Sequence, residues 1–323
     1  MFNGKKVVIL VWSPIGYEVY LSLCLMMGAD NVILISARNF NPPEASSFLG
    51  LNHHYFTQTK DEINKVCCEL RGSINQAIIP CGKFILFVPQ MGNFYGRSLI
   101  ESNFCESFFI YDEGSAAYGD HFVKKCKEVW MRKNLIPSES LIDFYSEFSI
   151  NLKNMSEMYF EGVKFYDVNH SKLKGLVGFF PDAFPGFEKI QIPIAPFDDF
   201  NNADLSKDIL VILPPVKQLI ENHIYLKYIE DINELINRGF QNVLIKPHPA
   251  DGNIPFEKYQ ALLGRGNSEN YHTYIQSLGM SPYRETALMG FGSYLTSGNS
   301  TQIYIEQLQK MEGALIGAEI FKN

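Results

Sequence analysis

The chain has few features of a secreted, membrane-spanning or nucleic-acid-binding protein. Its 323 residues contain no apolar run near the ~20 residues that a bilayer-spanning helix needs. Lysine and arginine number 28 against 35 aspartates and glutamates, which gives a net charge of −7. An acidic balance argues against general binding to nucleic acids or to anionic membranes, although a local basic pocket is compatible with it.

Cysteine is scarce and poorly spaced for metal binding. All six cysteines fall in the first half of the chain, with no Cys-x-x-Cys pair and no histidine at ligand spacing: Cys24, Cys67, Cys68, Cys81, Cys105 and Cys126. A zinc site is therefore not expected. Small buried apolar side chains in a reducing compartment account for these cysteines better than disulfides do.

The first residues superficially resemble a signal peptide, because Lys5 and Lys6 precede the apolar stretch 7–12. Ser13 and Pro14 interrupt this stretch, and no small-residue cleavage site follows it. The segment is more typical of a first buried strand. We expect a cytoplasmic protein, and peripheral association with the inner face of the membrane is left open.

The first half of the chain alternates short apolar runs with helical patterns. The 46% hydrophobic and 14% aromatic content fits a well-buried globular protein, and the length accommodates two domains. Strands are predicted over residues 7–12, 31–35, 84–88 and 108–111, and helices over 17–27, 61–70, 98–105 and 119–133. This rhythm predicts a parallel sheet with helices on both faces.

The second half repeats the alternation after an irregular region over residues 135–204, where several prolines break any long element. Strands are predicted over 208–213, 242–246 and 293–296, a loop over 269–274, and helices over 218–238, 256–262, 282–289 and from about residue 300. The sequence predicts an α/β protein with two Rossmann-like domains, residues 1–160 and 161–323, facing a central cleft. The closing helix could pack back on the first domain.

An acidic pair follows the predicted strand that ends at Tyr111. Asp112 and Glu113 come directly after the apolar run, and Gly114 then permits a sharp turn. Such acids point out of the carboxyl edge of a parallel sheet. Taken alone, an acidic pair at this place is more typical of a helix cap or a solvated turn than of a catalytic site.

A histidine follows a predicted strand in the second half. His248 lies between Pro247 and Pro249, whose rings fix φ and remove two backbone donors, so the loop is stiff. A lone histidine is usually structural. A carboxylate and an imidazole at strand ends in two facing domains, however, would supply a base and an acid on opposite sides of one cleft.

Three segments, in this order, resemble the signatures of bacterial GT-B sialyltransferases. They are the acidic-acidic-Gly segment 111–115 with Tyr118 after it, the Lys-Pro-His-Pro segment 246–249, and the paired-hydroxyl segment 297–301. The resemblance covers these segments and the two-domain layout but not the first hundred residues, and the hydroxyl pair is Ser-Thr here rather than Ser-Ser. It implies inverting transfer of sialic acid from CMP-sialic acid to a glycan hydroxyl.

The resemblance also implies roles for individual residues. Glu113 would take the acceptor proton with Asp112 as its orienting partner, and His248 would act as a general acid on the departing phosphate. Which of the two acids is the base is left open by the sequence. The other implied binding residues are Gly114, Lys246, Pro249, Glu285 on the ribose, Ser297, Gly298, and the hydroxyls of Ser300 and Thr301 at a helix N-terminus that would hold the phosphate.

No Asp-x-Asp sequence occurs in the chain. Metal-dependent glycosyltransferases use that motif to hold a divalent ion on a diphosphate, whereas a CMP-sugar has a single phosphate. We therefore expect neither a metal nor a cofactor. Two alternatives stay open: another cytidine-nucleotide GT-B transferase that moves glycerophosphate or Kdo, and a non-catalytic glycan- or nucleotide-binding protein.

The expected acceptor is an oligosaccharide, and nothing in the donor motifs identifies it. A galactose-terminated glycan of a lipooligosaccharide or a capsule and sialic acid itself are both compatible with the motifs. The linkage, the number of residues transferred and the oligomeric state are equally open.

Overall fold

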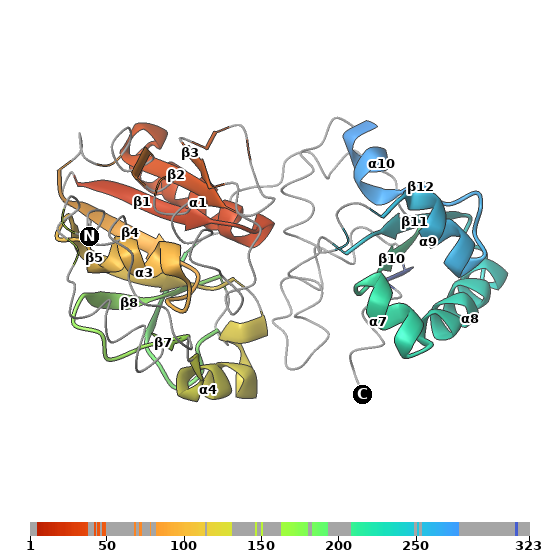
Figure 1. Ribbon diagram of the computed structural model, residues 1–323. Coiled ribbons are helices and arrows are strands. Elements are labelled where there is room, and N and C mark those ends of the chain that lie inside the picture. Colours follow the sequence, from red (N-terminus) through yellow and green to blue (C-terminus); the bar gives the residue numbers. More distant parts are fainter. Residues whose placement is uncertain are drawn as a thin grey trace. The chain divides into compact units, whose positions relative to one another are not determined.

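The computed structural model describes residues 5–37, 82–113, 115–130, 163–179, 183–192, 208–248 and 254–277, with the short segments 47–49 and 314–315 and a few single residues between 42 and 251. The chain divides into two compact units, Met1–Ala195 and Pro196–Asn323. Each unit contains its own parallel sheet accompanied by helices (Figure 1).

The first unit is built on a seven-stranded sheet in the order β3-β2-β1-β4-β5-β8-β9, and all its strand pairs are parallel. The strands are β1 (Lys6–Val11), β2 (Val32–Ala37), β3 (Ser47–Leu49), β4 (Phe84–Val88), β5 (Cys105–Tyr111), β8 (Leu173–Gly178) and β9 (Lys189–Gln191). Strands β2 and β4 are buried along their whole length. They are continuous apolar runs because both faces of a parallel sheet are covered.

Helix α1 (Pro14–Met27) connects β1 to β2. Helix α3 (Phe94–Glu101) lies between β4 and β5 along the chain. The chain leaves β1 in one direction along the sheet and later leaves β4 in the other. Because such crossovers are right-handed, the two helices cover opposite faces. The strand order therefore reverses between β1 and β4, which is the place where open α/β sheets bind ligands.

Smaller elements complete the first unit. They are the short 3-10 helices η1 (Ala29–Asn31) and η4 (Ser115–Ala117), helix α4 (Gly119–Lys127), and the antiparallel pair β6 (Val129–Trp130) and β7 (Val163–Lys164). Phe122 is buried on the inner side of α4, whereas Lys124 and Lys127 are exposed. These two lysines of α4 therefore face solvent.

The first unit extends further than the sequence predicted. Strand β8 pairs with β5, and β9 pairs with β8, so residues 173–178 and 189–191 complete the first sheet. The observed boundary follows Ala195 and corrects the predicted boundary after residue 160. The prolines of this region do exclude long elements, but strands of 6 and 3 residues fit between them.

Two predicted helices have different ends. The helix predicted over 98–105 is α3, which begins at Phe94 because Asn93 caps its N-terminus, and Cys105 already belongs to β5. The helix predicted over 119–133 ends at Lys127, and a strand follows it. The helix predicted over 61–70 lies outside the described residues except for Cys68, which is helical.

The second unit is built on a four-stranded parallel sheet in the order β12-β11-β10-β13. Its elements are β10 (Asp208–Ile212), α7 (Val216–Glu221), α8 (Ile224–Asn237), β11 (Asn242–Lys246), α9 (Phe256–Leu263), β12 (Glu269–Asn270), α10 (Tyr271–Ser277) and β13 (Ala314–Leu315). Tyr228 of α8 and Tyr259 of α9 pack in one core with Val211 and Ile245 of the sheet.

The second unit corrects three details of the prediction. The single helix predicted over 218–238 is divided into α7 and α8, because His223 adopts a left-handed conformation with φ of 54°. The loop predicted over 269–274 contains β12 and the start of α10. Within the predicted closing helix, Ala314–Leu315 is a strand that pairs with β10.

Two parallel sheets in two compact units confirm the predicted α/β class with two Rossmann-like domains. The cleft between the domains stays a prediction. The elements predicted over 282–289 and 293–296 lie outside the described residues. Among the described helices, none combines the length and apolarity needed to cross a bilayer.

Candidate functional site

Tyr111 connects strands β5 and β1 at the carboxyl edge of the first sheet. This last residue of β5 donates a hydrogen bond of 2.8 Å from its phenol to the backbone carbonyl of Leu10 in β1, on the far side of β4. A Cβ added to Gly16 would lie 2.5 Å from the same phenol oxygen. Only glycine at position 16 therefore allows the first turn of α1 to approach the sheet so closely.

Two buried amides hold the loop that follows β4. The Gln90 side-chain oxygen accepts a hydrogen bond of 2.6 Å from the backbone N–H of Gly92. The Asn93 side-chain oxygen accepts one of 2.6 Å from the N–H of Gly96 and so starts α3. Sequence reasoning missed this turn, although an asparagine before an apolar helical pattern is a recognised N-cap signal.

Asp112 is the anchored member of the acidic pair. It is 1% exposed, and its backbone N–H donates a hydrogen bond of 2.8 Å to the carbonyl of Val177 in β8. The phenol of Tyr118 donates a hydrogen bond to its Oδ2. Tyr118 is itself held by a backbone bridge to Ala183. The Asp112 carboxylate is thus fixed by groups from two neighbouring segments.

Glu113 is the accessible member of the pair, since its side chain is partly exposed where that of Asp112 is buried. Neighbouring residues at a strand end point in opposite directions, which accounts for the difference. The geometry suits Glu113 to accept a proton from a bound hydroxyl. Asp112 fixes the loop through its two hydrogen bonds, and the catalytic roles of both acids stay predictions.

Lys246 ends β11 at the carboxyl edge of the second sheet. Its side chain is 6% exposed, and burial lowers the pKa of the ammonium to about 8. Within residues 208–248, 251 and 254–277, no carboxylate forms an ion pair with this ammonium. A buried cation without an acidic partner is suited to bind an anion.

His248 lies in the loop after Lys246 and is partly buried. Burial lowers the pKa of its imidazole, and the ammonium of Lys246 lowers it further, while Asp251 acts in the opposite direction. Asp251 also ties the loop down: its N–H donates to the His248 carbonyl (3.0 Å), and its carboxylate accepts from the Val216 N–H (3.1 Å) and the Tyr259 phenol (3.0 Å). The position of His248 is therefore set by α7 and α9.

His272, in the first turn of α10, joins the same edge of the second sheet. Burial lowers the pKa of its imidazole to about 4, and Lys246 adds to that effect. Sequence reasoning missed this residue, because the segment 269–274 carries no motif and was predicted to be a loop. The position of His272 depends on the pairing of β12 with β11. A strand of two residues is too short to show a recognisable sequence pattern.

The structure brings the predicted site residues to the carboxyl edges of their own sheets. Asp112 and Glu113 lie at the edge of the first, and Lys246 and His248 at the edge of the second. The pairing of Glu113 with His248 across a cleft stays a prediction. The remaining predicted residues lie outside the described part of the chain: Gly114, Pro249, Glu285, Ser297, Gly298, Ser300 and Thr301.

The metal-ligating and thiol side chains are dispersed through the described ranges. There, no three histidine, cysteine, aspartate or glutamate side chains gather so as to hold a metal ion. The cysteines that the structure describes, Cys24, Cys68, Cys105 and Cys126, are free thiols. Burial raises the pKa of Cys105 to about 12, so this thiol stays protonated and unreactive at neutral pH.

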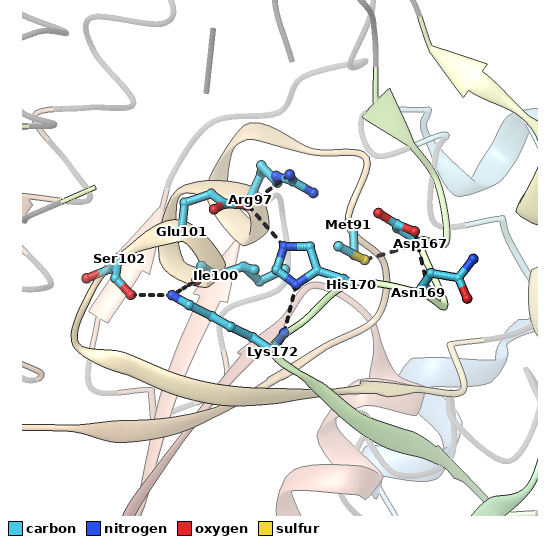
Figure 2. A network of polar contacts seen from close by, with 9 residues as sticks. All are labelled: Met91, Arg97, Ile100, Glu101, Ser102, Asp167, Asn169, His170 and Lys172. Carbon is cyan, nitrogen blue, oxygen red and sulfur yellow. Dashed lines mark hydrogen bonds and ion pairs between the residues drawn. The ribbon is translucent and has the colours of Figure 1, made fainter. Parts of the chain in front are cut away.

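A buried ionic cluster, drawn in Figure 2, lies where α3 ends and β5 and β8 begin, which is the amino edge of the first sheet. Glu101, the last residue of α3, is 2% exposed. One of its carboxylate oxygens lies 2.8 Å from the Arg97 guanidinium and 3.2 Å from Nε2 of His170. The His170 ring meets the edge of Phe108 in β5. The cluster fastens α3 to the sheet.

Lys172 extends this network along the end of α3. Its ammonium donates hydrogen bonds of 2.7 Å to the carbonyl of Ile100 and 2.8 Å to that of Ser102 (Figure 2). Carbonyls in the last turn of a helix lack partners within the helix, so a lysine here is a C-terminal cap. Burial lowers the pKa of Lys172. We interpret the network as structural.

Replacing Glu101 by leucine is expected to lower the free energy of unfolding by about 3–5 kcal/mol, the usual cost of removing one partner of a buried ion pair. Arg97 would keep its charge at a site where its side chain is only 14% exposed. The matched control is Glu128→Leu, which removes a more exposed pair with Lys125 and should cost less than ~1 kcal/mol. Urea unfolding measures both, and equal losses would contradict the structural role of the cluster.

Comparisons with known proteins give little beyond the architecture. No protein-family model matches the chain, and no curated protein is detectably similar to it. Among solved structures, the chain is similar to the spinosyn rhamnosyltransferase SpnG, with a TM-score of 0.35 and 11% identity over 97% of this chain and 93% of that one. It is also similar to WaaG, a glycosyltransferase involved in lipopolysaccharide biosynthesis, with a TM-score of 0.29 and 11% identity over 82% and 69%. Scores this low carry no argument about function.

Proposed function

We propose that this chain is a metal-independent, inverting GT-B glycosyltransferase that moves sialic acid from CMP-sialic acid to a hydroxyl of an oligosaccharide. The observation that carries the proposal is a complementary pair of strand-end sites. One parallel sheet ends in an anchored and an accessible carboxylate, Asp112 and Glu113, and the other ends in a buried cation beside a histidine, Lys246 and His248. Transfer from a nucleotide sugar needs a base on one side and an anion site on the other.

On the acceptor side, the reaction removes a proton from a hydroxyl. The anomeric carbon of sialic acid is tertiary and carries a carboxylate, so its displacement is oxocarbenium-like. The acceptor oxygen forms a bond to that carbon while the bond to the phosphate oxygen breaks, and the hydroxyl proton passes to Glu113. Asp112, held by Tyr118, keeps the loop in place during this step.

On the donor side, the departing phosphate gains negative charge. The ammonium of Lys246 stabilises that charge in a poorly hydrated site, where electrostatic stabilisation is strongest. In the empty protein Lys246 lowers the pKa of His248. A bound phosphate acts in the opposite direction, because a nearby negative charge favours the protonated imidazole. His248 then has a proton to give to the leaving group.

The choice of CMP-sialic acid over other donors is supported by the acidic-acidic-Gly segment 111–115, which resembles a signature of the sialyltransferases. Incubation with CMP-sialic acid, CMP-Kdo and CDP-glycerol, each with and without a galactose-terminated acceptor, tests it. Release of CMP from CMP-sialic acid that depends on the acceptor supports the proposal. Release from CDP-glycerol or CMP-Kdo alone favours the other transferases, and binding without release favours a non-catalytic protein.

Activity is expected to survive EDTA unchanged. A single phosphate needs only the positive charge of Lys246, the imidazole of His248 and the predicted hydroxyls of Ser300 and Thr301, with no bridging ion. The measurement is CMP release after extensive dialysis against EDTA, with and without added Mg²⁺ or Mn²⁺. A strict need for either ion would contradict metal-free transfer.

A further inference from the structure

We infer that His272 is a third member of the donor-phosphate site, with Lys246 and His248, and that binding of a nucleoside monophosphate there takes up protons. This inference rests on the proposed function only for the identity of the nucleotide. None of the three motif segments contains His272. This residue belongs to helix α10 instead.

Strand pairing places His272 beside Lys246. In the parallel pair β11–β12, Ile245 lies opposite Asn270, so the next residues along, Lys246 and Tyr271, are neighbours at the carboxyl edge. Helix α10 begins at once and packs against β11 (Figure 1). The backbone N–H of His272 donates a hydrogen bond of 2.9 Å to the Asn270 side-chain oxygen.

The neighbouring residue Tyr271 restrains His272 in this position. Tyr271 is 1% exposed, and its ring meets the edge of the His272 ring with centroids 5.9 Å apart. The buried tyrosine fixes the start of α10 in the core of the unit. The imidazole of His272, which is partly buried, therefore stays near the end of β11.

Lys246 connects the two histidines electrostatically. Its ammonium lowers the pKa of both His248 and His272, which belong to two separate segments of the second unit. Among the described residues, Lys246 of β11 acts on both imidazoles and Asp251 of the following loop acts on His248, while Glu269 of β12 belongs to the strand before α10. Glu269 is exposed. Asp251 acts on His248, and its carboxylate accepts from Val216 and Tyr259.

A phosphate completes this arrangement. Burial and Lys246 keep His272 uncharged at neutral pH in the empty protein, because the lowered pKa lies well below 7. A phosphate monoester brings up to two negative charges and several acceptor oxygens, which raises the pKa of nearby imidazoles and accepts their hydrogen bonds. Each histidine that becomes charged takes one proton from solution.

Calorimetric titration with CMP, in two buffers of different ionisation enthalpy at one pH, measures the proton uptake. We expect uptake by the unaltered protein. In His272→Asn, uptake should fall and CMP should bind about tenfold or more weakly, the loss typical of a hydrogen bond to a charged group. Cytidine, which lacks the phosphate, should bind both proteins equally. The matched control is His223→Asn, which changes an exposed histidine of the same unit at a left-handed position that asparagine tolerates.

Each other outcome overturns the inference or corrects only the proposed function. Unchanged CMP affinity and proton uptake in His272→Asn would remove His272 from the site, even if sialyl transfer is observed. Equal weakening of CMP and cytidine would make its role structural, and no binding of any phosphate probe would refute the site. If UMP or inorganic phosphate binds with the expected dependence on His272 but CMP does not, the site stands and the proposed donor fails.

Discussion

The variant Glu113→Gln is expected to lose acceptor-dependent transfer by about 10²–10⁴-fold, the usual contribution of a positioned general base. Glutamine keeps the size and polarity of the side chain but removes its basicity. Affinity for CMP should change by less than about tenfold, or ~1.4 kcal/mol, because the proposed nucleotide site consists of residues of the second unit. Acceptor-dependent turnover and calorimetry with CMP are the two measurements.

Asp112→Asn is the matched comparison and should be milder. Asp112 is 1% exposed and accepts the phenol hydrogen bond of Tyr118, and an asparagine side-chain oxygen can still accept that bond. Tyr118→Phe removes only the phenol hydroxyl, and its turnover should be similar to that of Asp112→Asn. If Asp112→Asn is inactive while Glu113→Gln transfers normally, the roles of the two acids are reversed. If both variants transfer normally, the proposed base and the proposed enzyme fail together.

The central strands could be predicted because burial on both faces makes them continuous apolar runs. Strands β1, β4 and β11 are of this kind, with all or nearly all residues buried. Strand β8 is different. Its sequence contains Lys174 and Gly175, its first half is only partly buried, and it forms by pairing with β5 rather than through an apolar pattern of its own. The domain boundary was misplaced for that reason.

The candidate site, like the sheet, was predictable only where its residues follow an apolar strand. Polar residues directly after an apolar run point to a strand end, and this identified Asp112, Glu113 and His248. The sequence could not show how these side chains are surrounded. It does not show that Lys246 is buried without an acidic partner in the described residues, or that Tyr118 donates a hydrogen bond to Asp112. These depend on segments that meet only in the folded chain, as His272 and Lys246 do.

Replacing His248 by alanine is expected to lower turnover by at least ~10²-fold while the protein stays folded, because the loop is held through backbone and Asp251 contacts that alanine retains. The variant His223→Ala, which alters an exposed histidine of the same unit, should transfer normally. Turnover with CMP-sialic acid and circular dichroism measure the two properties. Near-wild-type turnover in His248→Ala would remove this residue from the mechanism.

The pH dependence of kcat/KM separates a proton donor from a merely structural histidine. A general acid acts in its protonated form, so kcat/KM should fall as pH rises through the pKa of His248 in the free protein, which burial and Lys246 place below the usual value. In Lys246→Met the repulsion from the ammonium is absent, the pKa of His248 rises, and the falling limb should move to higher pH. KM for the donor should rise at the same time, because the phosphate loses a cation. A limb that stays at the same pH in Lys246→Met would show that its titrating group is not His248.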